Sequence, residues 1–358
     1  MDMTEASWKT TARTIVLSVL IGAGAGTFAS ALTNSYLSDY AFQLQQWTEP
    51  LGLSQERPRA FPKTYEEALD RVSERAAPGV VQLYSASSRT DGFVPDEAVL
   101  TGAVLTSDGW IVVDPEGISE ALLSLTAVVG SEAYEVLEVV PDPATGFAFA
   151  KIAADHLPVA AFGDGFDAVG AEQVFVLAGA NEVVATSVAS ADWRPSAVLL
   201  SDEPSRRIVL QTQGNGLVQG SPVANLSGEL IGFVDGVLPD GRASVLPTEA
   251  ILPALQSLLR EGSVLRPMLG VAALDLARAA GVDDAVSLGH DVGAVVVSST
   301  AKELQKGDVI LEVQGEVMIA DRTLDEHVLT LVPGDSVLLE VDRAGERVAV
   351  TVTLNAQK

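Results

Sequence analysis

Two hydrophobic patterns divide the chain. Residues 14–38 carry no charge and contain TIVLSVLIGAGAGTFASAL, about the 20 apolar residues that a helix needs to cross a bilayer. From residue 80 onward, short β-branched-rich runs alternate with Ser-Asp-Gly, Gly-Asp-Gly and Leu-Ser-Gly turns. Such spacing of strands and turns is typical of an all-β barrel or sandwich. The pattern therefore predicts one membrane-spanning helix in front of a mostly β body.

Two helical segments interrupt the strands and help to divide the chain into parts. The first begins at Thr64, a residue suited to cap a helix, and ends at Pro78-Gly79. The second covers residues 248–261 and ends at Gly262, which favours a left-handed C-cap. We expect four parts: a cytoplasmic stub and anchor (1–38), a tether (39–63), a β-barrel body (64–265) and a C-terminal unit (266–358).

The charges around the apolar run predict its orientation. Lys9 and Arg13 precede it and Asp39 follows it, so the positive-inside rule places the N-terminus in the cytoplasm and the body on the periplasmic or extracellular side. The alternative is a cleaved signal peptide, because residues 29–31 (Ala-Ser-Ala) have the form of a cleavage site. We favour a retained single-pass anchor over residues 14–33, because the uncharged run continues beyond the usual length of a signal-peptide core.

Composition excludes several classes of function. With 22 Lys and Arg against 48 Asp and Glu, the net charge of −26 repels nucleic acid, so we expect no nucleic-acid partner. The chain has no cysteine, which excludes disulfides, thiolate metal sites and a cysteine nucleophile. Asp114 and Glu116 could form a carboxylate pair, but no further residues stand at a spacing typical of metal ligands. We expect neither a metal nor a cofactor.

The order of the segments resembles the HtrA (high-temperature-requirement) serine proteases. The resemblance implies a chymotrypsin/trypsin-like double β-barrel over 64–265, a PDZ domain over 266–358 and a homotrimer built through the barrels. It covers nearly all of the part that we expect to be exported. The matching segments, in chain order, are ALDRVSERAAPGVVQL, TGAVLTSDGWIVV, DPATGFAFAKIAADHLPVAAFGD, QGSPVANLSGELIGF, SVLPTEAILPALQSLLREGSVLRPMLGV and LQKGDVILEVQGEVM.

The positions that align with the family's catalytic triad carry other residues. The general-base histidine position falls on Gly117, the orienting aspartate position on Gly146 and the nucleophile position on Gln219. Leu217 and Val218 occupy the turn that supplies the family's oxyanion hole. An amide cannot attack a carbonyl, and a serine hydroxyl needs an imidazole within hydrogen-bond reach. The sequence therefore predicts a catalytically degenerate member, a pseudoprotease that is not an enzyme.

The alternative is an active serine endopeptidase of envelope protein quality control with a relocated catalytic site. Ser221 lies two residues beyond Gln219, and His156 follows the segment that resembles the aspartate strand. We favour simpler interpretations, a small residue in a turn for Ser221 and a solvated turn residue for His156. His290 and His327 belong to the PDZ-like unit, remote from the barrels in the chain.

The PDZ-like unit keeps the residues that its binding chemistry requires. The segment RPMLGV resembles the loop whose backbone N–H groups hold the C-terminal carboxylate of a peptide, followed by an open strand edge. An idle groove is the alternative. The predicted peptide-binding residues are Arg266, Met268, Leu269, Gly270 and Val271.

These observations predict a membrane-anchored protein that acts by binding. Its expected partners are peptide or protein C-termini and unfolded segments, and active HtrA-like subunits are a further expected partner. The expected role is that of a scaffold, a chaperone-like protein or a regulator of an active protease on the outer face of the cytoplasmic membrane.

Overall fold

The computed structural model describes residues 62–85, 98–115, 119–179, 182–214 and 217–357. The predicted anchor over 14–33 and Gly117 lie outside these residues. Within the described part of the chain, no helix is both long enough and apolar enough to cross a membrane.

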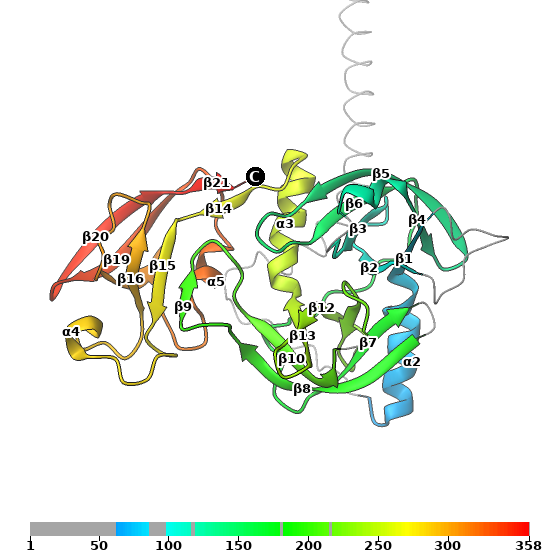
Figure 1. The fold of residues 1–358 in the computed structure, drawn as a ribbon, viewed down its shortest axis with the longest axis horizontal. Coiled ribbons are helices and arrows are strands. Elements are labelled where there is room, and N and C mark those ends of the chain that lie inside the picture. The colour runs from blue at the N-terminus through cyan, green and yellow to red at the C-terminus, as the bar shows by residue number, and fades with distance from the viewer. Residues whose placement is uncertain (1–61, 86–97, 116–118, 180–181, 215–216, 358) are drawn as a thin grey trace, which may run out of the picture. The chain divides into compact units, whose positions relative to one another are not determined.

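The first barrel is built from the β-branched-rich runs of the N-terminal half (Figure 1). Six antiparallel strands close on themselves in the order β1-β2-β3-β6-β5-β4. Their inward side chains, Leu83, Ile111 and Ile152 among them, fill the interior of the barrel. The strands and 3₁₀ segments are η1 (Ala77–Gly79), β1 (Val80–Ser85), β2 (Leu100–Val104), β3 (Trp110–Val113), η4 (Ser119–Ser124), β4 (Leu125–Val129), β5 (Glu132–Pro141) and β6 (Ala148–Ile152).

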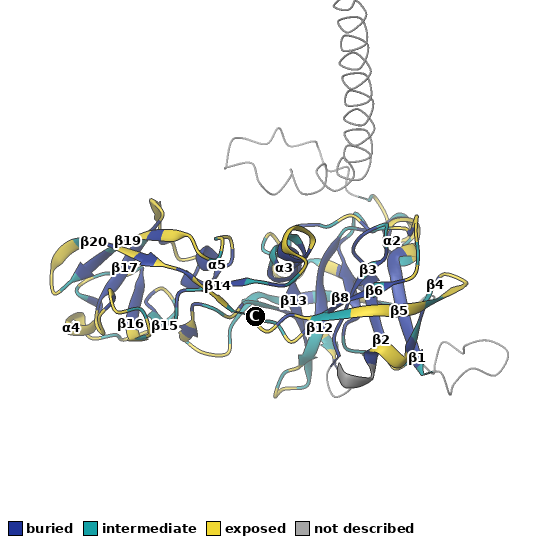
Figure 2. Cartoon of the chain, turned by 90° about the horizontal axis from the view of Figure 1, so that it is seen from above, coloured by how far each residue is buried: buried dark blue, intermediate teal, exposed yellow. Residues whose placement is uncertain are grey.

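The second barrel repeats this architecture with six antiparallel strands in the order β10-β13-β12-β11-β7-β8. Val176, Ile208 and Val245 lie in its separate interior core. Figure 2 shows most strands of the two barrels as buried, whereas β5 is largely exposed and β8 is mostly of intermediate burial. The strands are β7 (Gln173–Gly179), β8 (Glu182–Trp193), β10 (Arg207–Gln213), β11 (Pro222–Ala224), β12 (Leu230–Val237) and β13 (Arg242–Pro247).

Both predicted helices of the barrel region are confirmed. Helix α2 (Tyr65–Arg75) is capped by Thr64, whose Oγ1 accepts a hydrogen bond from the Glu67 N–H at 3.1 Å. Helix α3 (Thr248–Glu261) ends at Gly262, which has a φ of 70°. Apolar side chains of both helices join Phe147, Phe175 and Phe233 in a core that the two barrels share. This shared core fixes one barrel against the other.

The C-terminal unit has the predicted β fold, with one addition. Its sheet runs in the order β20-β19-β17-β16-β15-β9, and β18 pairs with β17. The strand at the edge of this sheet is β9 (Val198–Leu200), which lies between β8 and β10 of the second barrel in the chain. The sequence assigned this segment to the barrel body. The other elements are β14 (Arg266–Met268), β15 (Val271–Asp275), α4 (Asp284–Ser287), β16 (Ala294–Ser299), β17 (Val309–Val313), β18 (Glu316–Val317), α5 (Leu324–Val328), β19 (Ser336–Arg343), β20 (Glu346–Thr353) and β21 (Asn355–Gln357).

Candidate functional site

Two of the three triad-like positions, Gly146 and Gln219, are described, and each lies in a turn. Gly146 lies between β5 and β6 with a φ of 81°, and open space surrounds the position of its missing Cβ. Gln219 lies in the turn before β11, and a Cβ on the next residue, Gly220, would collide with the Thr101 carbonyl of β2. The turn of the second barrel therefore packs directly against the first barrel. The Leu217 N–H donates to the Gly214 carbonyl at 3.0 Å, so this N–H is used within its own loop.

The chain's three histidines are all described, and none of their imidazole rings is hydrogen-bonded to a hydroxyl within the described part of the chain. His156 is exposed on the turn after β6. The His290 Nε2 lies 2.8 Å from an Asp342 carboxylate oxygen, inside the C-terminal unit. Burial lowers the pKa of His327 to about 4, which keeps this imidazole neutral at neutral pH. Ser221 is buried, and its Oγ has no hydrogen-bond partner among the described residues.

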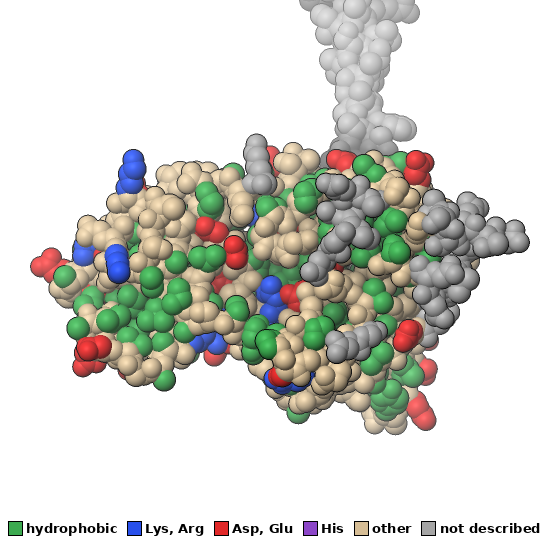
Figure 3. Space-filling view, in the orientation of Figure 1, with side chains coloured by type: hydrophobic (Ala, Val, Ile, Leu, Met, Phe, Trp, Pro, Cys, Tyr) green, Lys and Arg blue, Asp and Glu red, His purple; other side chains and the backbone are tan. Residues whose placement is uncertain are grey.

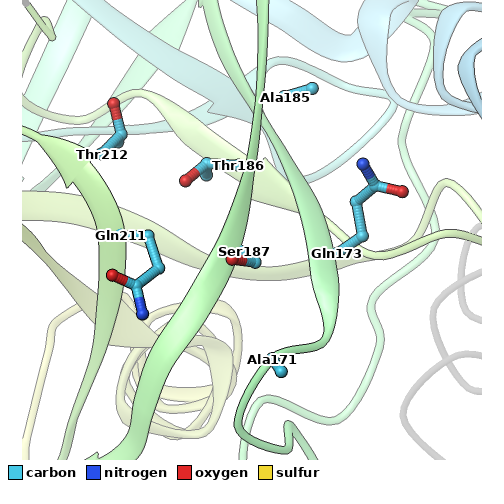
Figure 4. A pocket seen from close by; sticks show the side chains of 7 residues that line it. All are labelled: Ala171, Gln173, Ala185, Thr186, Ser187, Gln211 and Thr212. Atoms are coloured by element: carbon cyan, nitrogen blue, oxygen red, sulfur yellow. The ribbon is translucent and has the colours of Figure 1, made fainter.

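An open hollow lies on the wall of the second barrel (Figure 4). Its lining comes from β7, β8, β10 and the turn before β7, and every side chain in it is uncharged. Such a surface offers hydrogen bonds but no acid, base or nucleophile activated by a neighbouring base. The lining residues are Ala171, Gln173, Ala185, Thr186, Ser187, Gln211 and Thr212.

The loop before β15 gathers backbone donors at one point. The N–H of Leu269 donates to Asp202 Oδ1 at 2.7 Å, and the N–H of Gly270 lies 3.0 Å from both carboxylate oxygens of the same aspartate. The N–H of Val271 donates to the Ser201 Oγ at 3.0 Å. Gly270 has a φ of 75°, a conformation that glycine adopts without strain. The loop is therefore a carboxylate-binding cradle of backbone N–H groups.

Arg266 and Met268, expected at the same site, have other roles in the structure. Arg266 is only 1% exposed, and its Nε donates to Asp142 Oδ1 of the first barrel at 3.0 Å. Its Nη2 also donates to the second Asp142 oxygen and to the Ala250 carbonyl of α3. Met268 pairs with Asn355 in the short sheet of β14 and β21. Arg266 thus links the C-terminal unit to the barrels, and it is neither a cation of the peptide groove nor a solvated linker residue.

Buried charges lie beside the cradle, where the barrel connection meets α5. The Arg194 Nη2 donates to Glu326 Oε1 at 2.5 Å, and both side chains are almost completely buried. Burial raises the pKa of Glu326, and the facing Arg194 opposes that shift. The N–H and Oγ of Ser205 both donate to Asp325 Oδ2, at 2.9 and 2.8 Å. On the surface drawn in Figure 3, acidic and basic side chains adjoin between the C-terminal unit and the barrels.

The comparisons with known proteins agree with this architecture. A PDZ-domain family model matches residues 267–354. A "Probable periplasmic serine endoprotease DegP-like" of Halomonas elongata is 29% identical over 271 residues, which are 71% of this chain and 56% of the relative. A protein of the same description from Pseudomonas putida is 26% identical over 284 residues, 75% of this chain and 58% of the relative. The chain thus spans just over half the length of these relatives.

Solved structures show the same fold. "HtrA-type protease AlgW with tripeptide" superposes with a TM-score of 0.60 at 20% identity, over 81% of this chain and 97% of that chain. "HtrA-type protease AlgW with decapeptide" gives 0.58 at 19% identity, over 81% and 98%. The chain is similar in sequence to DegP-like serine endoproteases and shares the fold of HtrA-type proteases. The resemblance to the HtrA family is therefore supported, and the double barrel and the PDZ domain predicted from the sequence are confirmed.

One expectation from the sequence is contradicted. We expect from Gly117, Gly146 and Gln219 that the protein is not an enzyme, whereas its relatives are named as serine endoproteases. Residue types at three aligned positions do not by themselves establish inactivity, because the roles of a triad are set by geometry and can be filled from other positions in the chain.

Ser201 and Asp202 are site residues that were not expected from the sequence. One signal in the sequence could have identified them. The short apolar run Ala-Val-Leu-Leu is followed directly by a small residue, Ser201, and a carboxylate, Asp202, and this is the composition of a PDZ ligand.

Proposed function

We propose that this HtrA-family protein binds peptides through the PDZ groove and recognises their free C-terminal carboxylate. The observation that carries the proposal is the convergence of the Leu269 and Gly270 N–H groups on one carboxylate. A terminal carboxylate offers the same two oxygens, and an extended peptide adds main-chain hydrogen bonds along β15. Family neighbours solved with a tripeptide and a decapeptide support this choice of ligand.

We further propose that the body lies in the periplasm, anchored by residues 14–33 with the N-terminus in the cytoplasm. The name of the relatives supports the compartment, and the uncharged apolar run supports the anchor. A cyclic trimer built through the barrels belongs to the same proposal, with the role of a scaffold or regulator for other HtrA-type subunits. Three grooves held together would bind multivalent unfolded chains with higher avidity than one groove.

The test of peptide binding compares a free acid with an amide. The probe is a fluorescein-labelled hexapeptide, Ser-Ala-Val-Leu-Leu-Ser, which is the sequence of residues 196–201. We expect the free acid to bind with a Kd in the micromolar range, because a short added strand buries little surface. The amide lacks the anion and should bind at least tenfold more weakly by fluorescence anisotropy. Equal affinities for the acid and the amide would show that the cradle does not recognise the C-terminal carboxylate of the peptide.

Serine endopeptidase activity is the second candidate function, favoured by the names of the relatives. It requires a serine that a base can activate, and Ser221, next to Gly220 at the contact between the barrels, is the hydroxyl to test. This candidate predicts a fluorophosphonate adduct on a barrel serine, located by mass spectrometry, and time-dependent cleavage of unfolded casein. Both signals should be lost in Ser221→Ala if that hydroxyl is the nucleophile. Absence of adduct and cleavage in the unmodified protein would remove this candidate.

A further inference from the structure

A segment of the barrel region occupies the edge of the PDZ sheet that a peptide would use. Strand β9 pairs antiparallel with β15, with Leu200 opposite Ala272 and Val198 opposite Leu274. The Ser201 N–H continues the ladder by donating to the Val271 carbonyl at 2.8 Å. Figure 1 shows β9, in green, beside the yellow β15. Strand addition at this edge is how PDZ domains hold extended peptides, and here the added strand belongs to the same chain.

The carboxylate in the cradle also comes from this segment. Asp202 follows β9 directly, and its two side-chain oxygens accept from the Leu269 and Gly270 N–H groups. The Ser201 hydroxyl accepts from the Val271 N–H and donates to Asp202 Oδ1 at 2.7 Å. An aspartate side chain thus stands where a terminal carboxylate would bind.

The side chains of the segment alternate as those of a bound peptide would. Leu199 and Ser201 are 7% and 1% exposed, whereas Val198 and Leu200 are 43% and 48% exposed. Successive side chains of a strand point to opposite faces, so one face of the segment is buried and the other remains in solvent.

Both ends of the segment are held beside α5. Before β9, Arg194 pairs with Glu326, and after Asp202, Ser205 donates twice to Asp325. Because these contacts flank the groove, the segment cannot diffuse away when it leaves the cradle, and its effective concentration there stays high.

We infer that residues 198–202 are an internal ligand of the PDZ groove, with Asp202 in place of a C-terminal carboxylate. A peptide from another chain binds by displacing this segment. The ligand class follows from the segment itself: an extended C-terminus with a large apolar residue at the third position from the end and a small residue at the end. This inference rests on the proposed peptide-binding function.

The first test removes the internal carboxylate in the full chain. In Asp202→Asn the nitrogen of the new amide cannot accept from the cradle, so the segment should compete less well. We expect this variant to bind the Ser-Ala-Val-Leu-Leu-Ser free acid about tenfold or more tightly than the unmodified protein. The matched control is Glu203→Gln, which removes the same charge from an exposed neighbour that makes no side-chain hydrogen bond or ion pair to any described residue. The control should stay within about twofold of the unmodified protein.

The outcomes separate the two proposals. Equal binding by the unmodified protein, Asp202→Asn and Glu203→Gln would overturn the internal ligand and leave peptide binding intact. An equal gain in both variants would assign the effect to charge alone and would also overturn it. Binding by none of the proteins would overturn both proposals.

The second test locks the segment in place. Opposed residues of an antiparallel pair have Cα atoms about 4.5–5.5 Å apart, within the span of a disulfide. The chain has no cysteine, so Leu200→Cys combined with Ala272→Cys allows one intramolecular disulfide only. We expect the oxidised form to bind the hexapeptide at least tenfold more weakly than the same protein after reduction. Each single variant should not respond to reductant. Failure of the disulfide to form, or equal binding before and after reduction, would contradict the inference.

Discussion

Replacement of Arg266 by methionine is expected to lower the free energy of unfolding by about 3–5 kcal/mol, because it leaves a buried carboxylate without its counter-charge. The side chains of Arg266 and Asp142 are 1% and 0% exposed, and the guanidinium binds both oxygens of the carboxylate. After the substitution, the described donors to Asp142 are the Ala144 N–H and the Thr145 hydroxyl, which do not neutralise its charge. Urea unfolding followed by circular dichroism measures the effect.

A double variant tests whether the unpaired charge of Asp142 causes the loss of stability. Adding Asp142→Asn to Arg266→Met removes the unpaired charge, so the double variant should be more stable than Arg266→Met alone by at least about 1 kcal/mol. The control is Arg260→Met, which breaks an exposed ion pair with Glu261 and should change stability by less than about 0.5 kcal/mol. If the double variant loses as much free energy of unfolding as the sum of the losses of the two single variants, Arg266 and Asp142 do not act as one buried pair.

Replacement of Gly270 by valine is expected to weaken binding of the free-acid hexapeptide at least tenfold. Gly270 has a φ of 75°, and a Cβ there would collide with the Thr300 Oγ1. Thr300 donates its N–H to the Gly270 carbonyl at 2.8 Å, so a displaced Thr300 would move the backbone that aims the Leu269 and Gly270 N–H groups. Fluorescence anisotropy measures the binding, and circular dichroism checks that the PDZ sheet remains folded.

A second glycine with a positive φ serves as a control that distinguishes backbone strain from a direct effect on the cradle. Gly281 has a φ of 70°, and nothing lies within 4 Å of the place where its Cβ would be. Gly281→Val should therefore suffer the same left-handed backbone strain, about 1–2 kcal/mol, and keep its peptide affinity. If Gly270→Val binds the peptide like the unmodified protein, or if Gly281→Val loses binding equally, the cradle is not the recognition site.

Local chemistry explains which features could be predicted from the sequence. The Thr64 cap and the left-handed Gly262 each depend on a few neighbouring residues, and both are present as expected. Strand runs separated by turns predicted a barrel or sandwich, because buried and exposed side chains alternate along each strand, and the resemblance to the HtrA proteases implied the two barrels that the structure has. The cradle at residues 269–271 needs only backbone N–H groups and a glycine, so its composition was visible as well.

Other features were decided by partners far away in the chain. Arg266 was expected near the groove, but its partner Asp142 lies 124 residues earlier, and only the fold brings the two together. The expectation of inactivity came from the residue types at Gly117, Gly146 and Gln219, whereas catalytic capacity depends on which groups meet in space.

The sequence by itself determined the mostly β class, the helix caps at Thr64 and Gly262 and the composition of the cradle, which all depend on residues close together in the chain. The order of the barrels and the PDZ domain followed from the resemblance of successive segments to the HtrA proteases. Only the tertiary structure decided what lies in the cradle. The run of residues 198–200 is a short apolar strand that fits several sheet edges equally well, and nothing local specifies its register or its sheet. Ser201 lies 70 residues before Val271, and only the folded connection brings Ser201 and Asp202 to the PDZ groove.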